Sequence, residues 1–145
     1  MTSSWTYPQA SPGLWFNTTE ASQDGVVLVG GSFQFDTTAN FGFYVLNQAG
    51  QVLQSDVWEG AYVKSVAMSI DGTKFTAAIS GTNGIYYFDR GTFTQGGSAQ
   101  WQYVQPGISK SSCAGISSDD TFAIGGSDDG YLYGFSARGN WGNAI

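Results

Sequence analysis

Histidine is absent from this chain of 145 residues, and cysteine occurs only once. Without histidine the sequence cannot form a Cys/His zinc site, a Ser-His-Asp triad or a Cys-His pair. The single cysteine, Cys113, excludes a disulfide within the chain. Because Cys113 lies in a run whose residues alternate between the two faces of a strand, we expect it to be a small core residue.

Charged side chains are also scarce, at 11% of the residues, and the net charge is −6. The few cations are scattered and form no basic stripe that could follow a phosphate backbone, so nucleic-acid binding is not expected. The five cationic residues are Lys64, Lys74, Arg90, Lys110 and Arg138.

Long apolar runs are missing as well, since none approaches the roughly 20 residues of a membrane-spanning helix. The first residues, MTSSWTYPQ, do not form a signal peptide. The sequence therefore predicts no membrane span. It leaves the compartment open between the cytoplasm and export with a signal removed, and it leaves open whether the chain is part of a longer protein.

Glycine and aromatic residues, by contrast, are abundant, with 21 glycines and 16% aromatic residues. Together with the few helix-forming residues, this composition favours short strands over helices. The length suits one domain, and an apolar content of 41% is adequate for a core. We therefore expect a single all-β domain over residues 1–145.

The clearest local signal is the stretch Thr121–Ser136, TFAIGGSDDGYLYGFS. It contains two runs of strand length separated by an Asp-Gly turn, where glycine accepts the positive φ of a tight turn. Comparable turns recur upstream at a nearly constant spacing, marked by Asp24, Asp71 and Asp119 and by Ser32, Ser80 and Ser127. A repeated four-strand unit of roughly 40–50 residues is typical of a β-propeller blade, and a β-sandwich is the alternative.

The runs and turns predict three four-stranded antiparallel blades, over residues 14–58, 64–104 and 111–136. An outer strand is expected at 51–58 in the first blade and at 98–104 in the second, whereas the third has no clear outer strand. The strand Ser4–Tyr7, which carries Trp5 and Tyr7, is therefore expected to complete the last blade.

Two stretches resemble a known repeat family. Ser65–Arg90, SVAMSIDGTKFTAAISGTNGIYYFDR, is similar to a blade of the WD40-like and pyrroloquinoline-quinone-type (quinoprotein-like) propellers, and Gly125–Asn140, GGSDDGYLYGFSARGN, resembles the quinoprotein-like repeat more closely. Trp101–Tyr103 and Trp5–Tyr7 resemble the aromatic pattern of that family's outer strand. The resemblance implies propeller blades but no particular activity, because the family includes dehydrogenases, scaffolds and ligand-binding proteins.

Three blades cannot close a ring, because propellers typically carry 4–8 blades. A half-propeller of this kind would leave two apolar blade faces open, which is more than a monomer normally exposes. We therefore expect two copies to assemble head to tail into a six-bladed ring, in which Ser4–Tyr7 of each chain completes the last blade of the other. The alternatives are a fragment of a longer propeller or a different partner chain.

Candidate sites for chemistry are weak. The Asp128-Asp129-Gly130 turn lacks the spacing of a calcium loop, so its aspartates are expected to serve the turn. A quinone site, which the resemblance raises, needs clustered acids and amides beside a tryptophan, and no such cluster is evident. We expect no catalytic, cofactor or metal residues. The carboxylates Asp36, Asp56 and Glu59 have no spacing that would distinguish a hydrolase pair from solvated loop acids.

The expected function is a non-catalytic binding or scaffolding module that assembles through its blade edges. The alternative is a lectin-like propeller in which aromatic side chains near turns stack on sugar rings. Its candidate ligand-binding residues are Trp15, Trp58, Tyr62, Trp141 and Asn143. A fragment of a quinoprotein enzyme is a less favoured third possibility.

Overall fold

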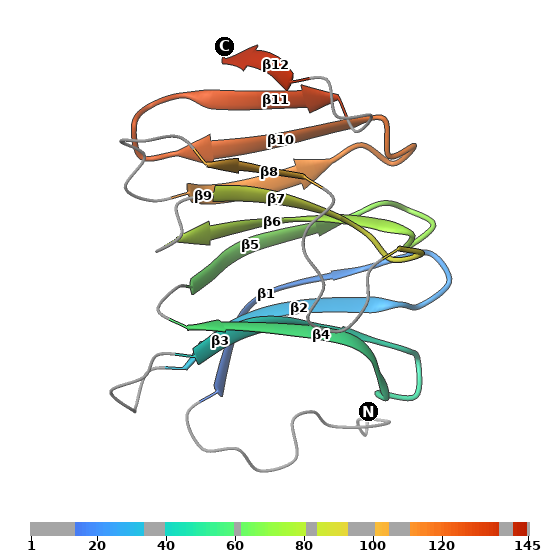
Figure 1. Cartoon of the computed structure of the whole chain (residues 1–145). Coiled ribbons are helices and arrows are strands. Elements are labelled where there is room, and N and C mark those ends of the chain that lie inside the picture. Colours follow the sequence, from blue (N-terminus) through green and yellow to red (C-terminus); the bar gives the residue numbers. More distant parts are fainter. Residues whose placement is uncertain are drawn as a thin grey trace.

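The computed structural model describes residues 14–33, 40–59, 62–80, 84–92, 101–104, 111–136 and 141–144. These residues form three four-stranded antiparallel sheets, and each sheet contains four strands that are consecutive in the sequence (Figure 1). The first sheet contains β1 (Leu14–Ala21), β2 (Val27–Phe33), β3 (Asn40–Leu46) and β4 (Val52–Glu59). The middle sheet contains β5 (Tyr62–Met68), β6 (Lys74–Ser80), β7 (Gly84–Asp89) and β8 (Trp101–Val104). The third contains β9 (Ser111–Ile116), β10 (Phe122–Ser127), β11 (Leu132–Ser136) and β12 (Trp141–Ala144).

The all-β prediction is confirmed, and so are eleven of the twelve strands, to within a few residues at their ends. The twelfth strand differs from the expectation. The third sheet has a fourth strand of its own, because β12 pairs with β11 through Phe135 opposite Trp141 and Tyr133 opposite Ala144. The expectation that this sheet lacks its own outer strand is therefore wrong. The strand Ser4–Tyr7, which is expected from the sequence at that place, lies outside the described residues.

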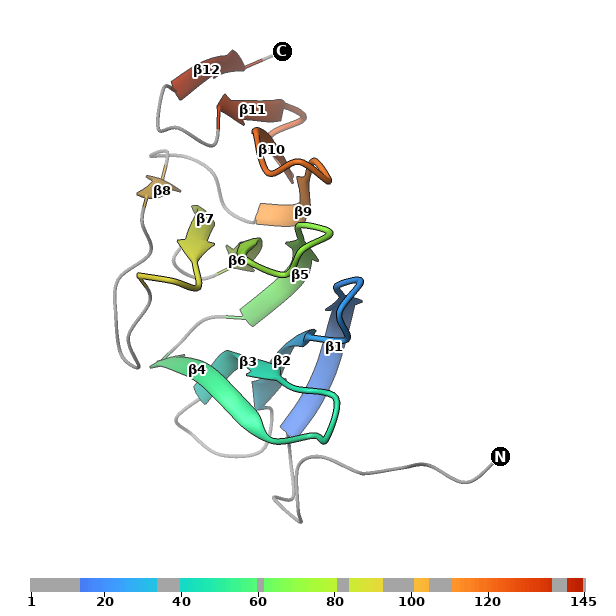
Figure 2. The ribbon, with the colours of Figure 1, turned by 90° about the vertical axis from the view of Figure 1, so that its right-hand side faces the viewer.

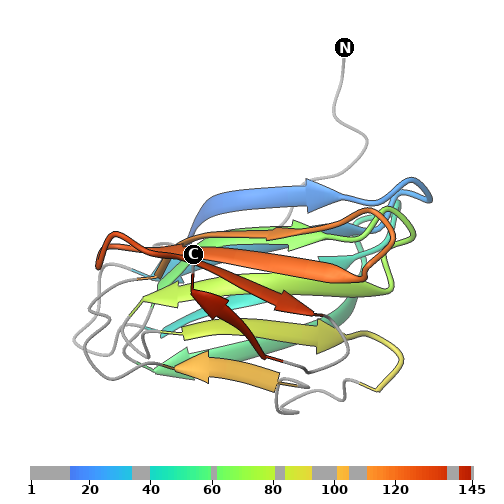
Figure 3. The ribbon, with the colours of Figure 1, turned by 90° about the horizontal axis from the view of Figure 1, so that it is seen from above.

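The three sheets are stacked and fan out from their first strands, β1, β5 and β9 (Figure 2). Seen from above, the sheets lie over one another with their strands running in similar directions (Figure 3). Two backbone hydrogen bonds join the first turns of neighbouring sheets, from Gln23 N to Ile70 O (2.8 Å) and from Ile70 N to Ser118 O (3.4 Å). The first hairpin turns of all three sheets therefore lie at one edge of the stack, which we call the turn rim.

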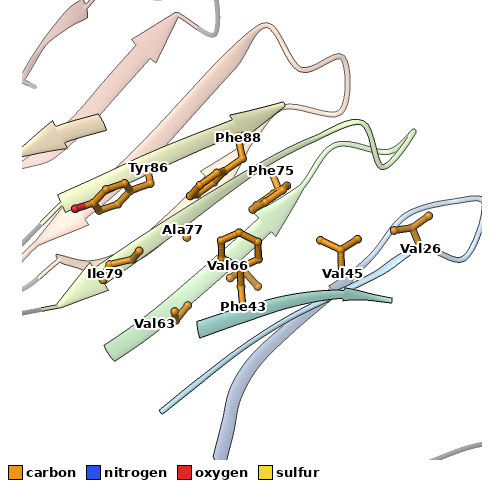
Figure 4. Packing of buried hydrophobic residues seen from close by; sticks show 10 residues of the cluster. All are labelled: Val26, Phe43, Val45, Val63, Val66, Phe75, Ala77, Ile79, Tyr86 and Phe88. Atoms are coloured by element: carbon orange, nitrogen blue, oxygen red, sulfur yellow. The ribbon is translucent and has the colours of Figure 1, made fainter. Parts of the chain in front are cut away.

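Aromatic packing joins the first sheet to the middle one (Figure 4). The ring centroid of Phe43, on β3, lies 4.9 Å from that of Phe75 on β6 and 4.9 Å from that of Phe88 on β7. Phe75 and Phe88 are themselves stacked at 4.7 Å. Because all three rings are fully buried, this cluster excludes water from the junction and holds the two sheets face to face.

The junction between the middle and third sheets has a smaller core, built from Ile85, Ala123, Tyr133 and Phe135. Ile85 on β7 fills the space above Gly125 on β10, where an added Cβ would lie 2.0 Å from the Ile85 Cδ1. A glycine is therefore required at this position by the close approach of the neighbouring sheet.

The first hairpin turn of each sheet places one residue in the left-handed region. These residues are Gly25 (φ 82°), Gly72 (φ 68°) and Asp120 (φ 56°). Each directly follows the aspartate that marks its repeat, so they hold the same place in the three repeats. Asp120 is the only one with a side chain, and in this conformation its Cβ crowds the backbone.

We expect Asp120→Gly to raise the free energy of unfolding by up to about 1 kcal/mol, because glycine accepts positive φ without that crowding. The matched change in the middle sheet, Gly72→Asp, should lower it by at least about 1 kcal/mol, since its Cβ would also lie 2.9 Å from Ser22. Urea unfolding of both variants measures the difference. A destabilised Asp120→Gly would show that the Asp120 carboxylate makes a contact that outweighs its backbone cost.

Candidate functional site

Each turn on the rim is held by a serine and by the aspartate two residues further along the chain. In the middle sheet, Ser69 Oγ donates to Asp71 Oδ1 (2.7 Å) and accepts from Lys74 N (3.0 Å). Asp71 also accepts from the Thr73 hydroxyl (2.9 Å). These bonds to the ionised carboxylate satisfy the turn's backbone and side-chain donors.

The same arrangement recurs in the other two sheets. Ser22 donates to Asp24 and accepts from Val26 N (3.0 Å) in the first sheet. In the third, Ser117 accepts from Phe122 N (3.0 Å), and Asp119 accepts from the Thr121 hydroxyl (2.9 Å). The repeated Ser-x-Asp spacing in the sequence is thus a repeated turn structure.

These hydrogen bonds lower the pKa of each turn aspartate below its ordinary value. The hydrogen bond from the Ser22 side chain is the main cause of the lowered pKa of Asp24, and the bond from the Ser117 side chain is the main cause for Asp119. For Asp71 the main cause of the lowered pKa is the hydrogen bond from the backbone N–H of Thr73. A lowered pKa keeps these groups charged at neutral pH and makes them stabilising above the unfolded-state value of 3.8. As the pH falls below that value, this stabilisation is lost.

Basic and amide side chains cross-link the rim. Arg90 Nη1 donates to Gly72 O (2.7 Å), and Gln54 Nε2 of the first sheet donates to Arg90 O (2.9 Å). Lys74 forms an ion pair with Asp89 (2.9 Å). Burial, with the negative charges of Asp120, Asp89 and Asp71, raises the pKa of Tyr87 to about 12. A shallow hollow of about 400 Å³ lies between Asp24 and Asp71, and its carboxylates are already engaged by their own turns.

The aspartates of the Asp128-Asp129-Gly130 turn also bond to groups of their own hairpin. Asp129 accepts hydrogen bonds from Tyr131 N (3.0 Å) and from the Tyr133 hydroxyl (2.5 Å). The Tyr133 bond is the main cause of the lowered pKa of Asp129. In the part of the chain that the structure describes, no group of three or more His, Cys, Asp or Glu side chains is placed to hold a metal ion.

An exposed apolar surface lies on the third sheet, on the face turned away from the middle sheet. We call it the outer face; it includes Phe122 and Ile124 of β10 and Leu132 of β11. Phe122 is 46% exposed and Leu132 is 42% exposed. A hollow of about 270 Å³ is present here, lined by Gly115, Ile116, Ser117, Phe122 and Ile124. Exposed apolar patches of this kind often mark binding surfaces.

Cys113 lies on this face, and its position differs from the expected place in the core. It lies opposite Gly126 in the pairing of β9 with β10, and it is exposed rather than buried in the core. The sequence shows the alternation of this strand, but the prediction that the face with Cys113 is buried is wrong. Alternation assigns residues to two faces without saying which one packs on a neighbour.

The positions proposed for sugar binding are divided between the turn rim and the opposite edge of the stack. Trp15 lies near the start of β1, Trp58 near the end of β4 and Tyr62 at the start of β5, all at the edge opposite the turn rim. Trp141 begins β12 at the rim end, and Asn143 lies two residues further along this strand. Their strands do not bring all five positions to one place. The assembly residues Trp5 and Tyr7 are outside the described residues.

Among the residues described, no helix has the length and the apolar character needed to cross a membrane. A scan of the chain against protein-family models and a search of curated proteins found no match.

Proposed function

We propose that this chain is a half-propeller of three quinoprotein-like or WD40-like blades, and that it acts as a non-catalytic binding or scaffolding module that assembles through its open blade faces. The observation that carries the proposal is the exposed outer face of the third sheet, at the end of a stack whose internal faces are packed. Three four-stranded meanders with neighbouring first strands support the comparison with propeller blades.

The internal junctions support a role in binding protein rather than a small molecule. Both are formed by apolar side chains of facing sheets, with Phe43 packed on Phe75 and Phe88 at the first and Ile85 inserted above Gly125 at the second. The outer face repeats this character, with large apolar residues beside glycines and no described cluster of polar groups. Such a surface fits another sheet better than it fits a sugar, which requires several hydrogen-bonding groups around its ring.

The test is the dependence of the melting temperature on protein concentration. A module that assembles through this face should melt at a higher temperature as its concentration rises, because association stabilises only the folded state. Leu132→Asp places a charge on the face and should abolish that dependence while leaving the melting temperature of the dilute protein within a few degrees. Asp128→Asn, which changes an exposed turn residue, is the control and should behave like the unmodified chain.

A lectin-like propeller would respond differently. Its melting temperature would rise with added saccharide and would not depend on protein concentration or on Leu132. That result would replace the assembly function with the carbohydrate-binding one.

A further inference from the structure

The register of the sheets identifies equivalent residues in the three repeats. On the second strands, the residues at positions 30, 78 and 126 are equally spaced in the sequence. They pair with Phe43 on β3, Ile85 on β7 and Leu132 on β11, respectively. Phe43, Ile85 and Leu132 are therefore equivalent residues of the three third strands. Phe43 and Ile85 are both 0% exposed, because each is inserted into the next sheet along the chain. Leu132 has the same place in the third sheet, where no described sheet follows it.

A second set of equivalent positions lies on the first strands. At the junction of the first and middle sheets, Thr18 Oγ1 accepts a hydrogen bond from Val66 N (3.2 Å). Thr18 pairs with Gly30, and Cys113 pairs with Gly126, so Cys113 is the third-sheet equivalent of Thr18.

The residue equivalent to Val66 is also identified by register. Val66 pairs with Ala77, and Thr19 pairs with Val29, which precedes Ala77 by one repeat. Thr19 therefore holds in the first sheet the place that Val66 holds in the middle one. Val66 is buried at its junction, whereas Thr19 and Cys113 are both exposed. Thr18 and Val66 are in contact inside the chain. Their equivalents, Cys113 on the third sheet and Thr19 on the first, are both exposed and lie on the two outermost sheets of the stack.

One molecule cannot bring these two ends together, because the middle sheet lies between the first and the third (Figure 1). We propose that two copies of the chain assemble head to tail, with the outer face of each third sheet packed on the first sheet of the other copy, as at the internal junctions. Leu132 then takes the place of Phe43 and Ile85, and Cys113 lies beside Thr19 of the partner subunit. The inference rests on the proposed function and names its partner.

The number of sheets determines the size of the assembly. The described residues of two chains contribute six sheets, which is within the 4–8 blades typical of propellers, whereas those of three chains would contribute nine. Because the contact is heterologous, it produces a closed ring only if the rotation between copies closes, and otherwise an open filament. A ring of two contains two identical junctions and exposes no further outer face.

The test uses the single native cysteine. In Thr19→Cys, a short bis-maleimide added at micromolar protein concentration should link the new thiol to Cys113 of the partner subunit and convert most of the chain to a covalent dimer. Larger products should be absent, since a closed ring has no remaining open end. A ladder of higher oligomers would overturn ring closure, and an absence of linked dimer would overturn the head-to-tail contact.

Three controls define the geometry. The unmodified chain should give no linked dimer, because two Cys113 thiols meet only if two third sheets pack face to face, and a dimer here would overturn the proposal. Glu20→Cys places the thiol on the opposite face of β1 and should remain unlinked. Thr19→Cys with Cys113→Ser should also remain unlinked, because two thiols at position 19 meet only if two first sheets pack face to face.

The outcome also separates this inference from the proposed function. Concentration-dependent melting without the Thr19→Cys dimer would leave the assembly function standing and refute the head-to-tail arrangement. A chain that neither melts in a concentration-dependent way nor cross-links would refute both.

Discussion

Replacement of Phe43 by alanine is expected to lower the free energy of unfolding by about 3–5 kcal/mol, which is a large part of the stability of a domain of this size. Phe43 is completely buried and packs against Phe75 and Phe88 at the junction of the first and middle sheets. Its removal leaves a cavity between two sheets, and the rigid strands on either side cannot collapse to fill it.

Denaturant unfolding followed by tryptophan fluorescence measures this effect. Tyr131→Ala is the matched control, because Tyr131 is an aromatic residue that is 55% exposed and its truncation should cost less than about 1 kcal/mol. If Phe43→Ala were as mild as Tyr131→Ala, the first sheet would not depend on this aromatic cluster for its attachment to the middle sheet.

A valine at position 125 is expected to destabilise the chain by about 3 kcal/mol or more. The Cβ added by Gly125→Val would lie 2.0 Å from Cδ1 and 2.6 Å from Cγ1 of Ile85, well inside van der Waals contact. Ile85 is itself enclosed by Ala123, Tyr133 and Phe135, so it cannot move aside without disturbing the junction. The strain must separate the third sheet from the middle one.

The cause can be tested by removing the opposing side chain. Ile85→Ala, added to Gly125→Val, should restore part of the lost stability, with a coupling energy of about 1–3 kcal/mol in the double-mutant cycle. Strict additivity of the two changes would show that Gly125 is required for its backbone conformation and not for the approach of Ile85.

The two internal junctions differ in how they are filled, and the outer face can be compared with both. The first relies on three phenylalanine rings, whereas the second relies on one isoleucine inserted above a glycine. On the outer face Leu132 stands opposite Gly126, and glycines at 115 and 134 lie beside Ile124 and Phe122. This face therefore has the side chains and hollows of a junction, and a second copy would bury them.

The rim of Ser-x-Asp turns has a different role. Its hydrogen bonds are satisfied within each turn, and backbone bonds from Gln23 to Ile70 and from Ile70 to Ser118 tie the turns together. The rim sets the spacing of the first strands, so it positions the junctions at which apolar packing supplies most of the stability.

The sequence by itself determined the local structure. The Asp-Gly turns, the alternating runs and the regular spacing of the repeats predicted an all-β chain with eleven of its strands, because turn chemistry and side-chain alternation act between residues that are close in the sequence. The strand at Trp141–Ala144 was missed, since it is short and depends on pairing with β11 rather than on a pattern of its own.

Only the tertiary structure decided which face of each strand is buried. Phe43, Ile85 and Leu132 occupy one repeat position, and no local signal distinguishes the two buried residues from the exposed one. The same holds for Cys113, whose strand alternates as expected but turns its thiol to the exposed side. Burial depends on whether a neighbouring sheet is present, and that is a property of the stack rather than of any segment within it.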